Sequence, residues 1–465
     1  MPDTEVPAGD SLSAQRKLES FGYSQQLRRS VSTFDLLVYG LVFMVPIAPW
    51  AIFGTVYNSA AGMVPLVYLI GLVAMVFTAL AYSQMAKSIP LAGSVFSYVG
   101  RGIHPAAGFF AGWAILLDYL LVPTLLYVFA AESMIGLFPG TPRWLWAIAF
   151  VLVNTVVNLM GIGSLKIANR IFLGIDLLFV AIFIVIAVRA ISGQALPGVA
   201  WSAAPIWNSA QVSGPLLASA LSIAVLSFLG FDGISTLAEE STGSRNPTGR
   251  AMVMALFVVA ALFIGQTWLA GLLAGGRPAF SEQEAGNAFF TLVQAAAGTG
   301  WMNAFFAVNV LAVGVANAIA AQAATSRLLF SMSRDRQLPA FLSKISARRV
   351  PMAALLLVSG ISLVLVLFFV GQIGLISSLV NFGALLGFCL LHVSVVWYYI
   401  GRRRSKNYLL HLVVPVLGLL IIAYVLINAD MLAKVGGLVW LGIGGLVFAV
   451  NKARGRGVPR LLEPR

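Results

Sequence analysis

Long runs of apolar residues, separated by short polar segments, repeat along almost the whole chain. A helix needs about 20 apolar residues to cross the roughly 30 Å hydrocarbon layer of a membrane, and each run has about this length. The pattern therefore predicts an all-α integral membrane protein with twelve transmembrane helices. The predicted spans are residues 34–57, 63–86, 105–135, 143–162, 167–190, 213–238, 251–275, 300–329, 351–370, 375–400, 409–428 and 434–451.

The composition supports this interpretation. Hydrophobic residues make up 60% of the 465 residues, charged residues only 10%, and the mean hydropathy is +0.93. A soluble core could not bury so much apolar surface. The first 30 residues are polar and contain no apolar stretch followed by a small-residue cleavage site, so they are predicted to form a cytoplasmic tail rather than a signal peptide.

The net charge of +13 would suggest a nucleic-acid partner in a soluble protein. Here, however, the basic residues lie in short segments between the apolar runs, where a positive-inside bias explains them without nucleic acid. With the N-terminus inside, 25 of the 29 Lys and Arg residues fall on the inner side, and only Arg143, Arg189, Arg277 and Lys434 fall outside. This asymmetry predicts that both termini are cytoplasmic and that the protein lies in the cell membrane.

Signals of enzymatic chemistry are absent. Cys389 is the single cysteine, so neither an intrachain disulfide nor a cysteine-based metal site is possible. The three histidines, His104, His392 and His411, lie in different segments, and no long polar stretch between spans provides a soluble catalytic domain. We therefore expect a protein that is not an enzyme and that uses no cofactor and no metal.

Two predicted spans contain helix breakers. In the first span, Pro46 and Pro49 each lack a backbone N–H and clash with the preceding turn, so the helix is predicted to break near Met44–Ala48. The sixth span contains Gly230 and Gly233. Breaks at corresponding places in spans one and six are typical of inverted repeats around a substrate site at the membrane midplane. The alternative is a pair of unrelated kinks, because no residue-level repeat joins the two halves.

Acidic residues occur inside the predicted spans, whereas Lys and Arg stay at the ends of the spans. The interior acids are Asp118, Asp176 and Asp232, accompanied by His392. Because a buried carboxylate without a basic partner favours a cation or a proton, this pattern predicts an amine-bearing substrate, a proton-coupled cycle, or both. The alternatives are structural: Asp232 caps a kinked helix, Asp118 packs with Tyr119, Asp176 bonds a neighbouring helix, and His392 is a satisfied packing residue.

Other side chains near the proposed break are less informative. Phe228 and Phe231 flank it, where an aromatic ring could stack on an amine or simply pack against a neighbouring helix. Uncharged polar residues in membranes usually bond one helix to another, so none of them is predicted to contact substrate. They are Asn154, Asn158, Gln266, Asn309, Asn317 and Asn381.

Four motifs stand in order along the predicted spans. They are Tyr82–Phe110 with Gly112-Trp113, Ser227–Ser241, Ser326–Asp335 with Leu338-Pro339, and Asn381–Leu385. Together they resemble the motifs of the amino acid/polyamine/organocation (APC) superfamily, and most closely those of its putrescine importer branch. The resemblance covers essentially the whole chain.

The resemblance implies a five-plus-five inverted-repeat (LeuT-like) core with broken helices 1 and 6, and a substrate site between the unwound parts of these helices. It divides the chain into a cytoplasmic tail (1–33), the core (34–400, with repeats 34–190 and 213–400), two accessory helices (401–451) and a second cytoplasmic tail (452–465).

The chain also departs from the family pattern. Many amino acid permeases hold a substrate carboxylate on a Gly-small-Gly turn in helix 1, but this chain has Met44-Val45-Pro46 there, with Gly40 upstream, as in the putrescine importers. Asp118 and Asp232 match acids of that branch, although some amino acid permeases are acidic at both positions too. Several proton-coupled members carry a lysine midway along helix 5, whereas the interior of this helix offers Asp176.

Together these patterns predict a secondary active transporter that moves an amino acid or a polyamine such as putrescine by alternating access, coupled to protons. The alternatives are an amino acid exchanger of the same fold and a membrane sensor that binds these ligands without transporting them. The expected partners are this small-molecule substrate, protons and membrane lipid, and the oligomeric state is left open. The predicted substrate-binding residues are Asp232, Gly230, Phe228, Phe231, Val45, Pro46, Ile47, Tyr119 and Asp118, and the predicted coupling residues are Asp176 and Asp232.

Overall fold

The computed structural model describes Glu19 and residues 23–24, 26–27, 29–138, 140–194, 196–242, 246–370 and 372–453. Most of the predicted N-terminal tail, and residues 454–465 of the predicted C-terminal tail, lie outside the described residues. The described part is built from helices, and its extended pairing is limited to one isolated parallel bridge between Val31 and Ser241. The prediction of an all-α protein is therefore confirmed.

The helices follow one another with short connections. In chain order they are α2 (Thr33–Met44), α3 (Pro49–Ser59), α4 (Val64–Ser88), α5 (Ser94–Gly102), α6 (Pro105–Leu137), α7 (Arg143–Leu159), α8 (Ile162–Ser192), α9 (Gly214–Ala224), the 3₁₀ segments η1 (Val225–Phe228) and η2 (Phe231–Glu240), α10 (Pro247–Leu273), α11 (Glu282–Ala285), α12 (Ala288–Ala297), α13 (Thr299–Leu311), the π-helix η3 (Ala312–Asn317), α14 (Ala318–Arg334), the 3₁₀ segment η4 (Ala340–Ser343), α15 (Met352–Phe369), α16 (Ile373–Val396), the π-helices η5 (Trp397–Arg402) and η6 (Leu409–Val413), α17 (Val414–Ile427) and α18 (Met431–Ala453).

Within the described residues, nine helices are long and apolar enough to cross a membrane, and each coincides with a predicted span. The first predicted span is the pair α2 and α3, whose axes are bent by 54°. The remaining two predicted spans fall on shorter elements. One is α7, with 17 residues, and the other is the 11-residue helix α9 followed by η1 and η2.

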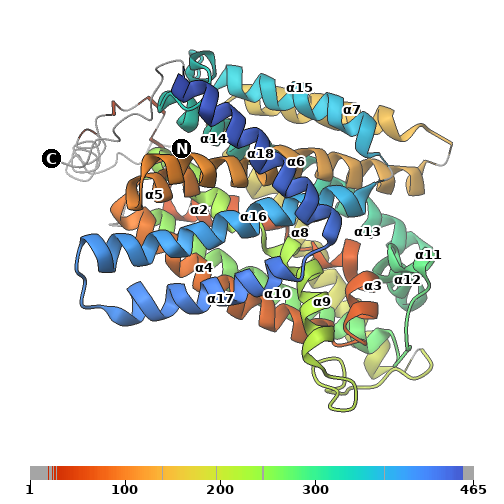
Figure 1. The fold of residues 1–465 in the computed structure, drawn as a ribbon. Helices are drawn as coiled ribbons and strands as arrows, with labels where there is room; N and C mark the ends of the chain where they lie inside the picture. Colours follow the sequence, from red (N-terminus) through yellow and green to blue (C-terminus); the bar gives the residue numbers. More distant parts are fainter. Residues whose placement is uncertain are drawn as a thin grey trace.

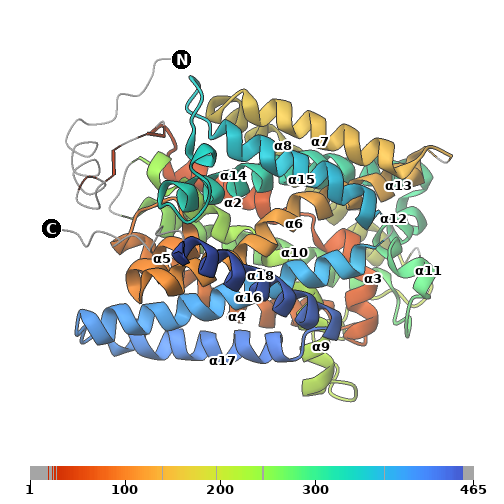
Figure 2. The ribbon, with the colours of Figure 1, turned by 45° about the horizontal axis from the view of Figure 1, so that its top comes forward.

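The long helices lie side by side, with α6 in the interior and α18 on the outside (Figure 1). The most apolar stretch of α6 is 83% buried, whereas that of α18 is only 17% buried. A helix that is apolar on its exposed side as well faces lipid rather than water. In the second view, α7 and α15 cover one face of the molecule and α16 and α17 run beside each other along another (Figure 2).

Both predicted helix interruptions are present. Helix α2 ends at Met44, Val45 adopts a positive φ of 53°, and the chain restarts as α3 at Pro49. In the sixth predicted span, α9 gives way to 3₁₀ turns, and Gly230 adopts a φ of 116° between η1 and η2. Because these turns leave the regular α-helical ladder, backbone groups and side chains of both segments become available to a site between them.

Candidate functional site

A cavity of about 90 Å³ lies between the two helix breaks. Its wall is made by the end of α2, the start of α3, one face of α6, the turns around η1 and η2, and the α13–η3–α14 segment. The two interrupted segments therefore meet at one cavity, as the sequence predicted for a substrate site.

Asp232 is an acid at this cavity and is only 2% exposed. The Tyr119 hydroxyl donates to its Oδ2 at 2.7 Å, and the Gly230 N–H donates to its Oδ1 at 3.3 Å. The second bond is a local turn interaction, so Asp232 does help to shape the break, as the structural alternative supposed. The carboxylate nevertheless lines the cavity and is fixed there by a tyrosine from α6.

Asp118 is a second acid at the same cavity, one residue before Tyr119 on α6, and is 4% exposed. None of the lining residues that the structure describes is Lys, Arg or His. Two carboxyl groups therefore share a cavity whose described lining offers no positive side chain to balance them. Such a space is complementary to a cation.

Five of the predicted substrate-binding residues line the cavity together: Val45, Asp118, Tyr119, Gly230 and Asp232. They come from three segments that are far apart in the sequence.

The other two predicted helix 1 residues lie beside this group rather than among the described lining residues. The Pro46 carbonyl accepts a hydrogen bond from Gln266 Nε2 on α10 at 2.7 Å, which anchors the break. Ile47 is fully buried.

The two phenylalanines beside the break also lie outside the described lining. Phe228 packs against Tyr68 and Phe263, at ring-centroid distances of 5.9 and 5.4 Å. Phe231 packs against Tyr82 and Phe388, each at 5.9 Å. Their surroundings match the packing alternative, because the 3₁₀ turns direct these rings toward α4, α10 and α16.

The remaining ionisable candidates lie elsewhere. Asp176 is buried within α8, 2% exposed, and is not one of the described lining residues. His392 Nε2 lies 3.2 Å from the Thr78 hydroxyl of α4, whereas its Nδ1 is buried without a hydrogen-bond partner in the described structure, so this histidine is only partly satisfied.

Sequence reasoning missed two asparagines of the wall. Asn309 and Asn317 line the cavity, and the side-chain oxygen of each is buried without a hydrogen-bond partner in the described structure. Asn154 Nδ2 donates to the Gly314 carbonyl and Asn158 Nδ2 to Gln322 Oε1, both at 2.8 Å, as expected of helix-to-helix contacts. Asn154 Oδ1 is also buried without a partner in the described structure, so what sets Asn309 and Asn317 apart is their place at the cavity. No signal in the sequence separates the two kinds of asparagine.

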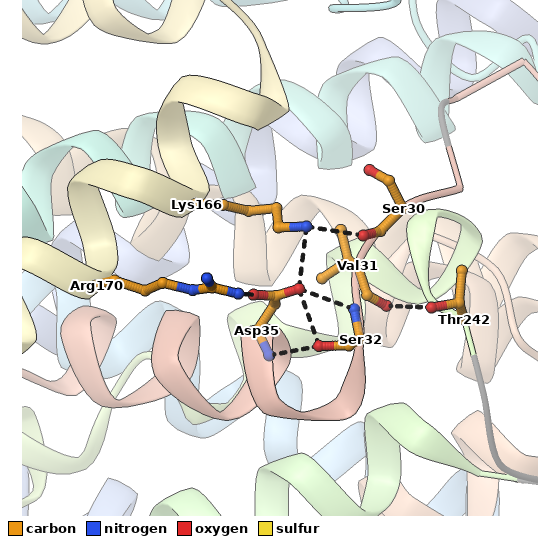
Figure 3. Close-up of polar contacts among 7 residues, drawn as sticks. All are labelled: Ser30, Val31, Ser32, Asp35, Lys166, Arg170 and Thr242. Carbon is orange, nitrogen blue, oxygen red and sulfur yellow. Dashed lines mark hydrogen bonds and ion pairs between the residues drawn. The ribbon is translucent and has the colours of Figure 1, made fainter. Parts of the chain in front are cut away.

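Ionic contacts tie both broken segments to neighbouring helices at the end predicted to face the cytoplasm. Figure 3 shows Asp35, at the start of α2, between Lys166 (3.1 Å) and Arg170 (2.5 Å) of α8. At the end of η2, Glu240 pairs with Arg327 of α14, and Glu239 pairs with Arg334 at 2.6 Å. The start of α2 and the end of η2 are therefore both held in place by charge pairs.

The family model described as amino acid permease matches residues 35–434. The chain is 29% identical over 442 residues to the low-affinity putrescine importer PlaP of Escherichia coli K12, covering 94% of this chain and 96% of that protein. It is 23% identical over 455 residues to the branched-chain amino acid permease BcaP of Bacillus subtilis, covering 91% and 93%.

Proposed function

This chain belongs to the amino acid permease family, and we propose that it moves an amine-bearing solute, a polyamine such as putrescine or an amino acid, across the cell membrane by proton-coupled alternating access. Its family and its apolar helices make it a multi-pass membrane transporter of the amino acid and polyamine type, not an enzyme.

The observation that carries the proposal is the pair of acids, Asp118 and Asp232, at a cavity whose described lining contains no base. A substrate ammonium that meets these carboxylates restores part of the solvation that the acids lose on burial. A carboxylate on the substrate would find few donors at the helix 1 break. The Val45 N–H donates to the Val42 carbonyl, the Ala48 N–H to the Val45 carbonyl, and Pro46 has no N–H. A polyamine therefore fits better than an amino acid.

The proposed architecture keeps the twelve spans and the five-plus-five repeat. In it, residues 34–190 and 213–400 form the two repeats, residues 401–451 form accessory helices, and tails 1–33 and 452–465 face the cytoplasm. Support comes from two helix breaks, one in each half of the chain, that meet at a single cavity. Alternating access would expose this cavity to either side in turn.

Uptake into proteoliposomes tests the proposal. Labelled putrescine and a panel of amino acids are offered to the purified full chain, with and without an inward proton gradient. Saturable uptake of putrescine that the gradient increases is expected. Uptake of neutral amino acids but not of diamines contradicts the polyamine assignment and leaves the transporter standing.

Two alternatives give different results in the same vesicles. An amino acid exchanger of the same fold would take up label only when the vesicles are preloaded with substrate. A sensor would bind the ligand without any uptake. We favour the transporter because the cavity lies between two broken helices rather than at a surface.

Proton coupling is assigned to Asp176 and Asp232, the buried acids that a proton can neutralise when no cation is bound. Replacement of Asp176 by Asn removes a proton site without touching the described lining of the cavity. We expect the variant to carry putrescine across the membrane until the internal and external concentrations are equal, and not to accumulate it in response to the proton gradient. In the wild type, one coupled proton would raise the ratio of internal to external putrescine by about tenfold per pH unit. The measurement is the ratio of internal to external label at steady state. If the ratio is unchanged, Asp176 does not carry the coupling proton, and Asp232 or another group must do so.

The backbone conformation at Gly230 gives a second test. Its φ is 116°, and a Cβ there would approach the Phe43 carbonyl oxygen to 2.9 Å. Because an L-residue is strained in this conformation by about 1–3 kcal/mol, Gly230→Ala should raise the half-saturating putrescine concentration by about 5- to 150-fold. Gly265→Ala is the matched control, since Gly265 lies within α10 with open space around its Cβ position. Equal uptake kinetics in the two variants would show that the backbone conformation at Gly230 does not affect transport.

A further inference from the structure

The cavity is elongated along α6. The α6 residues that line it run from Asp118 to Phe129, which corresponds to about 16 Å of helix. The α13–η3–α14 segment runs antiparallel to this wall. The Thr325 hydroxyl donates to the Tyr119 carbonyl at 2.5 Å, while Gly314, eleven residues earlier, faces Ala130, eleven residues later. The acids therefore mark one end of the cavity, and the opposite end is lined by η3 and Phe129.

Asn317, at the end of the π-helix η3, lies along this wall away from the acids. Its side chain is buried, 8% exposed, and its Oδ1 has no hydrogen-bond partner in the described structure. Buried acceptors are normally satisfied, and an unsatisfied one destabilises the empty protein. Because π-helical turns occur frequently at functional sites, the position of Asn317 is also of the kind that binds ligands.

The spacing between the acids and Asn317 sets the length of a ligand that would reach both. Eight residues of α14 separate Asn317 from Thr325, which places the Asn317 backbone about 12 Å along the helix from the level of Tyr119. A saturated chain with four methylene groups holds its two nitrogens about 6 Å apart. Adding a hydrogen bond of about 2.9 Å at each end gives a span of about 12 Å.

We propose that Asn317 binds the second ammonium group of a linear diamine whose first ammonium group is held by Asp232 and Asp118, and that Asn317 thereby selects two-headed amines over monoamines. This inference rests on the proposed function, because it extends the same cavity. The amide supplies an acceptor for a charged N–H donor at the far end of the ligand, where a monoamine presents only a methyl group. The segment formed by η3 and α14 would therefore select substrates by their length and by the charge at their far end.

The test compares putrescine with n-butylamine, which has the same chain length and lacks the second amine. Both are titrated against the purified full-length protein, with binding followed by displacement of labelled putrescine. In Asn317→Leu we expect the affinity for putrescine to fall by about 10- to 100-fold, the range for a hydrogen bond to a charged donor, while the affinity for n-butylamine stays the same or rises.

Asn428→Leu is the matched control. Asn428 is an exposed asparagine at the end of α17, where its Nδ2 donates to the Tyr424 carbonyl, and it is not among the described residues that line the cavity. This variant makes the same chemical change away from the cavity and should bind both amines as the wild type does. A gain variant, Asn317→Asp, should increase the preference for putrescine over n-butylamine, and it keeps the test decisive if Asn317→Leu does not fold.

Equal losses for the two amines in Asn317→Leu, or an unchanged preference in Asn317→Asp, would overturn the assignment of Asn317 while leaving amine transport intact. If the wild-type protein binds neither amine, the polyamine assignment fails, and this inference fails with it, whereas amino acid transport is still tested by the uptake panel.

Discussion

Uptake of putrescine by the Asp232→Asn variant falls by about 30-fold or more at low substrate concentration, while the amount of protein in the membrane stays unchanged. The carboxylate is 2% exposed and bonded to Tyr119, so a substrate ammonium that meets it is removed from water. Loss of one partner of such a buried charge pair costs about 2–5 kcal/mol. An amide of the same shape keeps the packing and removes the charge.

The experiment needs a control that makes the same chemical change elsewhere. Asp430→Asn replaces an exposed acid at the connection between α17 and α18, far along the chain from the cavity lining, and should transport like the wild type. Membrane abundance of each variant is measured by surface labelling or immunoblotting. Full uptake by Asp232→Asn would leave this acid with only its local role in capping the turn at Gly230.

Arg327→Met is expected to destabilise the folded protein by about 3–5 kcal/mol, the second large effect. Arg327 is 7% exposed, and its guanidinium donates to Glu240, whose exposure is 2%, and to the Ala323 carbonyl at 3.0 Å. Removal of the arginine leaves Glu240 buried without its charge partner, and this imbalance is the costly part of breaking a buried pair.

A thermal-unfolding midpoint of the detergent-solubilised protein measures the effect. Arg143→Met is the control, because its 2.7 Å pair with Glu132 is half exposed and contributes at most about 1 kcal/mol. Adding Glu240→Gln to Arg327→Met should restore much of the lost stability by removing the unpaired charge. A midpoint no lower than that of Arg143→Met would show that the pair at the end of η2 does not hold this segment.

The acids and the helix breaks of the candidate site can be predicted from the sequence, whereas the asparagine that lines the cavity cannot. Asp118, Asp232 and the two breaks were recognisable because a carboxyl group or a proline within an apolar run is costly wherever it points. The lining role of Asn317 was not recognisable, because an amide within a span is ordinary when a neighbouring helix supplies its partner. Whether the amide finds a hydrogen-bond partner depends on which side chains and backbone groups the neighbouring helix places beside it, and only the tertiary structure shows this.

The same limit explains the two phenylalanines. Phe228 and Phe231 stand within four residues of Asp232 in the sequence, and this closeness suggested that they enclose an amine. The 3₁₀ geometry of η1 and η2 changes the rotation per residue, so the rings pack against Tyr68 and Tyr82 of α4 instead.

The sequence by itself determined the helical membrane architecture, the two interrupted segments and the presence of interior acids without interior bases. Each of these follows from the free energy of a single residue or run in hydrocarbon, which does not depend on the rest of the fold. Only the tertiary structure decided which side chains share the cavity. Whether a side chain lines the cavity depends on the rotation of its helix about the helix axis and on the register of that helix against its neighbours. Both are set by the packing of the helices. For this reason Asn317 lines the cavity and Phe231 does not.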